Sequence, residues 1–199
     1  MAIDFQAIVE SQLADGISPR MRPFLIARPR GSTYEQTWEY YAFAYENAFE
    51  ALAQHYCRVY PKQQYLLIPL VQLARHSIEL SLKSAIDECT YFLSKPRTQS
   101  SHNLLHLYDS LNQILLELGM IDEDDEWTKS SRRFLVHISE VDPRGMTFRY
   151  PSDLAGSPFD PIDVDLEGLI RAHSHITGMA DATTTMLQER ANYPYERYF

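Results

Sequence analysis

Cysteine is scarce in this sequence, which has only Cys57 and Cys89 among its 199 residues. Neither lies in a Cys-x-x-Cys pair or near a spaced pair of histidines. Those patterns are the usual signatures of disulfide frameworks and structural zinc sites. The sequence therefore argues against both kinds of scaffold, and we expect the two thiols to be reduced and buried.

Long apolar runs are also missing. The longest candidate, YLLIPL at residues 65–70, is interrupted by Pro69, whereas a membrane-spanning helix needs about 20 predominantly apolar residues. The N-terminal stretch MAIDFQAIVE has no basic region ahead of an apolar one, as a secretory signal would have. We expect a cytoplasmic protein without a membrane-spanning segment.

Positive charge is in deficit, because 18 Lys and Arg residues face 27 Asp and Glu residues, which gives a formal net charge of −9. Such a surface repels polyanions, so contact with nucleic acid requires a local basic patch. This argues against a dedicated binder of duplex DNA. It is compatible with a protein that touches a few phosphates in a cleft, or with one that binds a basic protein partner. Composition does not separate these two.

Strand signals are absent as well, since no stretch alternates apolar and polar residues with β-branched enrichment. Apolar residues instead recur at helical spacing. The expected helices span residues 33–60, 64–94, 101–119, 124–141 and 163–191. With 45% hydrophobic residues, the chain has enough apolar surface for a core. The sequence therefore predicts an all-α fold, an up-and-down helical bundle of about five helices.

The predicted bundle occupies residues 33–191, between an N-terminal arm at 1–32 and a C-terminal tail at 192–199. The arm contains a cluster of arginines among prolines, namely Arg20, Arg22, Arg28 and Arg30. Residues 142–162 are rich in Pro, Gly and Asp, and we expect a long loop there that is docked on the bundle.

Arg132, Arg133 and His137 on the fourth predicted helix are the candidate catalytic residues. A guanidinium that binds phosphate and an imidazole that titrates near neutral pH are sufficient for RNA cleavage without a metal. Spacing alone also fits an exposed face of ion pairs formed by Lys129, Arg133, His137 and Glu140. We expect no metal and no cofactor.

Three stretches in order, LARHSIELSLKSAI (73–86), HNLLHLYDSL (102–111) and SSRRFLVH (130–137), resemble the HEPN domain. This helical family is common in prokaryotic defence, toxin-antitoxin and nucleotidyltransferase-associated systems. The resemblance covers residues 33–141. It implies a homodimer in which an Arg and a His, separated by four to six residues, form a ribonuclease site.

Arg132 and His137 match that motif, although active members often have Asn, Asp or His where this chain has Arg133. EVDPRGMTFRYPSD (140–153) is similar to a segment of uncharacterised bacterial HEPN-like proteins. The resemblance implies an RNA-directed protein with metal-independent endoribonuclease activity. The alternative is a noncatalytic dimeric module that binds a partner protein or a nucleotide.

Arg149 is a candidate phosphate-binding residue, because an arginine in a structured loop beside aromatic residues can approach a phosphate. The alternative is docking of the loop, in which Phe148 and Tyr150 fill the bundle and Arg149 pairs with Asp142 or Asp153.

Arg75 is the second candidate for phosphate binding, against the alternative of an ion pair inside the bundle. His102 and His106 lie four apart, yet no carboxylate pattern accompanies them, which favours capping and packing over metal binding. His173 falls on an apolar stripe and is predicted to be a hydrogen-bonded core histidine.

Overall fold

The computed structural model describes residues 3–15, 34–95, 101–122 and 124–192. Within these ranges it contains six α-helices and, in place of any strand, a single antiparallel bridge between Ser152 and Pro158. The expectation of an all-α fold is confirmed. The chain divides into two units, Met1–Ser32 and Thr33–Phe199.

The first unit contains α1 (Phe5–Asp15), a sixth helix that the sequence did not predict and that lies outside the range expected for the bundle. This helix lies in the range 1–32, where the sequence predicted only an N-terminal arm. The four arginines of the arm and the tail from residue 193 onward lie outside the described residues.

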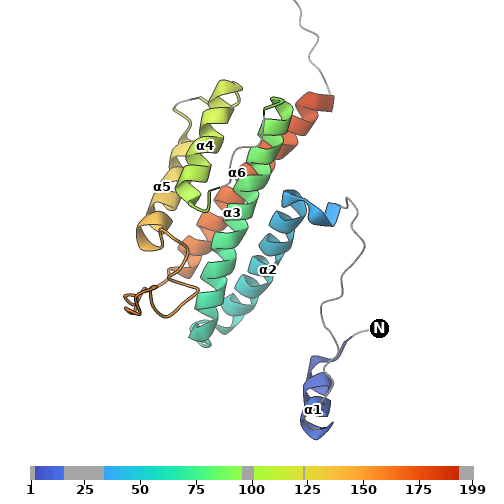
Figure 1. Ribbon diagram of the computed structural model, residues 1–199, viewed down its shortest axis with the longest axis vertical. Helices are drawn as coiled ribbons and strands as arrows, with labels where there is room; N and C mark the ends of the chain where they lie inside the picture. Colours follow the sequence, from blue (N-terminus) through green and yellow to red (C-terminus); the bar gives the residue numbers. More distant parts are fainter. Residues whose placement is uncertain (1–2, 16–33, 96–100, 123, 193–199) are drawn as a thin grey trace, which may run out of the picture. The chain divides into compact units, whose positions relative to one another are not determined.

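The second unit is the helical bundle (Figure 1). Its helices are α2 (Trp38–Val59), α3 (Leu67–Phe92), α4 (Leu104–Glu117), α5 (Glu126–Val141) and α6 (Leu166–Asn192). The longer expected ranges at the starts of α2 and α3 include two 3₁₀ turns, Tyr34–Gln36 and Gln64–Leu66. Helix α3 packs against α2, α4 and α6, while α5 packs against α4 and α6. The central position of α3 buries it on most sides.

Short polar side chains begin three of these helices. Thr37, Asn103 and Asp125 accept hydrogen bonds from backbone N–H groups three residues later, at 3.1, 3.0 and 2.7 Å. These bonds satisfy donors that have no partner within a helix. Asn103 therefore caps α4, two residues after the expected start of this helix at residue 101. Gly119 ends α4 with a φ of +61°, a conformation that favours glycine.

The hydrophobic core of the bundle has two clusters. One joins α3, α4, α5 and α6 and is centred on residues such as Leu82, Leu111 and Leu135. The other joins α2 to the first half of α3 around Phe49 and Leu70.

His173 on α6 lies between α2 and α3. Its Nε2 and Ser77 Oγ are 3.0 Å apart, and the centroids of its ring and the Phe49 ring are 3.9 Å apart. Only 2% of the residue is exposed, and burial lowers its pKa to about 4. The prediction of a core histidine is confirmed.

Candidate functional site

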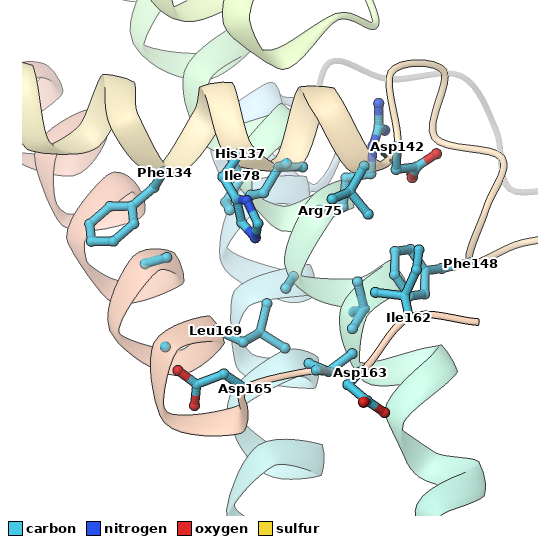
Figure 2. A pocket seen from close by; sticks show the side chains of 17 residues that line it. Arg75, Ile78, Phe134, His137, Asp142, Phe148, Ile162, Asp163, Asp165 and Leu169 are labelled. Carbon is cyan, nitrogen blue, oxygen red and sulfur yellow. Dashed lines mark ion pairs between the residues drawn. The ribbon is translucent and has the colours of Figure 1, made fainter. Parts of the chain in front are cut away.

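A cavity of about 320 Å³ lies between α3, α5 and the start of α6 (Figure 2). The loop after α5 supplies the remaining wall. Most lining side chains are apolar, namely Val71, Ala74, Ile78, Phe134, Ile138, Val141, Phe148, Ile162, Val164, Leu169 and Ala172. The polar lining residues are Arg75, His137, Asp142, Asp163 and Asp165. An apolar hollow with a few polar groups is the usual form of a small-molecule site.

His137 points from α5 into this cavity, as Figure 2 shows. It is exposed, and its imidazole has no hydrogen bond or ion pair with any other described residue. The position follows from helix geometry, because Phe134, His137, Ile138 and Val141 follow an i, i+3, i+4, i+7 pattern and share one face. This spacing could have assigned His137 to the apolar stripe from sequence alone.

Arg132 and Arg133 line a different depression on α5, together with Glu126, Lys129 and Val136. Arg132 donates to both carboxylate oxygens of Asp109 on α4, at 2.9 and 3.1 Å, and this bonding raises the pKa of Arg132. Within one chain, the structure therefore does not bring the guanidinium of Arg132 and the imidazole of His137 into a shared cavity.

Arg133 is exposed and contacts groups on its own helix. Its Nε donates to the carbonyl of Lys129 at 3.4 Å, and its Nη2 donates to Ser130 Oγ at 3.3 Å. These are weak local contacts, so the guanidinium keeps most of its hydrogen-bonding capacity for a ligand.

Two carboxylates, Asp163 and Asp165, come from the segment that leads into α6. Both are exposed, and neither forms an ion pair or a side-chain hydrogen bond within the described part of the chain. From sequence alone, these residues mark only the expected start of a helix, where acids are common. Their role in a cavity depends on tertiary contacts that spacing does not reveal.

Arg75 and Asp142 form an ion pair at the end of the cavity where α5 passes into the loop. Arg75 Nε and Asp142 Oδ2 are 3.5 Å apart, and the side chains are 5% and 2% exposed. Neither atom has a hydrogen-bond partner within the residues described. The candidate phosphate ligand Arg75 is thus buried and already paired with a carboxylate.

Glu79 extends this buried charge network along α3. Its Oε1 accepts from Lys83 Nζ at 2.7 Å and lies 2.8 Å from His102 Nδ1, while its Oε2 is 3.6 Å from Arg75 Nη1. Burial, the largest single influence, would raise the pKa of Glu79, but the hydrogen bonds and charge interactions with Lys83 and His102 together outweigh it and leave the pKa lowered. Glu79 and Lys83 are four residues apart on α3, a spacing typical of helical ion pairs; the structure shows that this pair is buried.

The loop after α5 is fastened to α3 by this network. Asp142 Oδ1 accepts from the backbone N–H groups of Met146 and Thr147, at 2.8 and 3.1 Å. Gly145 has a φ of +68°, and a Cβ at this position would lie 2.5 Å from Arg75 Nη1. The guanidinium therefore packs directly against the glycine backbone, which fixes one wall of the cavity.

The FRYP part of the loop is only partly docked. Phe148 lines the cavity, whereas Tyr150 is 54% exposed. Arg149 Nε and Nη2 donate to the carboxamide oxygen of Gln72 at 2.9 and 3.2 Å, in the amide orientation that satisfies both groups. In that orientation the partner of Arg149 is an amide of α3 and not Asp142 or Asp153. Arg149 is exposed and lies outside the cavity lining.

Comparisons with protein-family models, with curated proteins and with solved structures give no match. Among the helices of the described residues, none has the length and apolar character needed to cross a membrane.

Proposed function

We propose that the chain is a noncatalytic binding module whose cavity between α3, α5 and α6 receives the apolar group of a small ligand. The observation that supports this is the cavity itself, with a volume of about 320 Å³ and walls of Val, Ile, Leu and Phe side chains. Pockets for small molecules have volumes of about 300 to 1,000 Å³. The cavity is therefore large enough for a ligand group that contains one ring system.

The charges of the lining argue against a nucleotide or RNA phosphate in the same cavity. One arginine and three aspartates line it, so the lining carries a charge of +1 − 3 = −2. Arg75 already has two carboxylate neighbours. A phosphate placed here would meet more negative than positive charge.

The test uses tryptophol, a neutral molecule with an indole ring, in calorimetric titration of the full chain. Ala172 is 7% exposed and lines the cavity, so Ala172→Leu fills part of the volume. Ala182→Leu places the same side chain on an exposed position of the same helix and serves as control.

We expect the wild type and Ala182→Leu to bind equally and Ala172→Leu to lose affinity at least about tenfold, which corresponds to about 1.4 kcal/mol. Equal binding by Ala172→Leu would contradict the proposal, as would a wild type that binds neither tryptophol nor its charged analogues tryptamine and indole-3-acetate at millimolar concentration.

A second candidate is metal-independent RNA cleavage in a homodimer, and the free imidazole of His137 favours it. His137 is exposed, and the equally exposed Arg133 lies four residues earlier on α5. The HEPN resemblance supports an arrangement in which a second copy places its Arg132 or Arg133 near this imidazole. His137 would move the 2′-hydroxyl proton, and the guanidinium would bind the scissile phosphate.

This candidate is tested by incubating RNA with the full chain in the presence of a chelator. Cleavage by the wild type and by His106→Ala, combined with no cleavage by His137→Ala, supports it; His106 is an exposed histidine on α4. Cleavage that survives in His137→Ala, or a wild type that cleaves nothing, refutes it.

A further inference from the structure

We infer that the ligand of the α3–α5–α6 cavity is a small organic cation, an apolar ring or branched alkyl group that carries one protonated amine. This inference rests on the proposed binding function and adds the charge of the ligand to it. Three features of the lining support the positive charge: two carboxylates without partners among the described residues, a compensated arginine and aromatic side chains.

Asp163 and Asp165 provide the negative charge. Their side chains are exposed and have no ion pair or hydrogen bond within the ranges that the structure describes. Arg171, an exposed cation six residues after Asp165, is paired with Glu167. The two carboxylates therefore keep their charge for a ligand at the cavity.

Arg75 does not cancel this charge. Its guanidinium lies 3.5 Å from Asp142 and 3.6 Å from Glu79, with all three side chains at most 5% exposed. This buried group is already compensated, so the field in the cavity is set mainly by Asp163 and Asp165. The formal net charge of −9 for the whole chain adds to the attraction for a cation.

Aromatic side chains complete the site. Phe134 and Phe148 line the cavity from α5 and from the loop, and His137 adds an imidazole (Figure 2). Aromatic faces attract ammonium groups, by about 0.5 to 2 kcal/mol, while their apolar surface covers a ring. The same walls suit the apolar body and the charged end of one molecule.

A free small molecule fits better than a peptide. A volume of about 320 Å³ is at the lower end of the range for small-molecule pockets. A peptide would extend beyond the cavity and would need further contacts on both sides.

The experiment compares three indole probes of different charge in calorimetric titrations of the full chain. Tryptamine carries an ammonium, tryptophol is neutral and indole-3-acetate carries a carboxylate. The variant is the double substitution Asp163→Asn with Asp165→Asn, in which asparagine at the helix start retains a favourable capping residue. The control is Asp160→Asn, an exposed acid outside the lining.

We expect tryptamine to bind more tightly than tryptophol, and indole-3-acetate to bind most weakly. Each carboxylate should contribute about fivefold to tryptamine affinity, or about 1 kcal/mol, which is the Coulomb energy of two unit charges about 4 Å apart in water. The double variant should lose this preference and keep its affinity for tryptophol, while Asp160→Asn should behave as the wild type.

Two results would overturn the inference and leave the proposed function standing. One is tryptophol or indole-3-acetate that binds at least as tightly as tryptamine; the other is an unchanged preference for tryptamine in the double variant. A short peptide, Lys-Trp-Lys, that binds where tryptamine does not would overturn the assignment to a small molecule. If none of the probes binds, the proposed function itself fails.

Discussion

His173 makes the stability of the bundle sensitive to acid. Its pKa of about 4 lies below the ordinary value of 6.5 because the imidazole is buried. As the pH falls, the unfolded chain takes up a proton at this residue before the folded chain does. The stabilisation that the neutral, buried imidazole contributes is therefore complete above the unfolded-state pKa. It is lost as the pH falls from there through the folded-state pKa.

The size of the effect follows from the two pKa values. Between about pH 7.5 and about pH 5, linkage gives a loss of about 2 kcal/mol in the free energy of unfolding for a shift from 6.5 to about 4. The variant His173→Gln has no titrating group at this position, so its stability should fall by about 2 kcal/mol less over the same range. His106→Gln, which changes an exposed histidine, serves as control.

The assay is urea unfolding followed by circular dichroism at both pH values, with the free energy extrapolated to water. His173→Gln is expected to be less stable than the wild type near neutral pH, so the informative quantity is the difference between the two pH values. If the wild type and His173→Gln lose the same free energy on acidification, the argument from burial is refuted.

Three further substitutions test the buried charge network and its exposed counterpart by urea unfolding. Gly145→Ala should destabilise the bundle by about 1 to 3 kcal/mol, because its Cβ would collide with Arg75 and its φ is positive; an unchanged midpoint would contradict this packing. Glu79→Gln removes a carboxylate that compensates Arg75 and should lower the free energy of unfolding by about 3 kcal/mol; a loss below about 1 kcal/mol would contradict its role. Arg132→Ala breaks the exposed pair with Asp109 and should change stability by at most about 1 kcal/mol; a larger loss would show that this pair has a structural role.

The helices could be predicted from sequence because their determinants are local. Apolar residues at helical spacing predicted α2 to α6. Pro61 and Gly119, which disfavour continuation of a helix, follow the ends of α2 and α4. The i,i+4 spacing of Glu79 and Lys83 is likewise typical of an ion pair on a helix, and the structure contains this pair. Its burial was beyond prediction from sequence, because it depends on the helices that surround α3.

The neighbours of His137 in the candidate site depend on how the helices pack together. The sequence analysis placed His137 on a surface with Arg132 and Arg133, whereas the structure places it in a cavity with Phe134, Ile138 and Val141. The buried positions within α5 are Ser131 and Leu135.

The cavity walls that α5 does not supply come from segments distant from α5 in the sequence. Asp163, Asp165 and Leu169 follow the long loop, and Val71 and Ile78 come from α3. No spacing within α5 could indicate these neighbours, since they meet only through tertiary packing.

Methyl NMR spectra of the full chain during titration with tryptophol test the central claim most directly. If an apolar group enters the cavity, the methyl signals of Val71, Ile138 and Leu169 shift, while those of the core residues Leu111 and Leu187 stay in place. If the cavity methyl signals stay in place while other signals shift, or if no signal moves, the cavity is not the binding site.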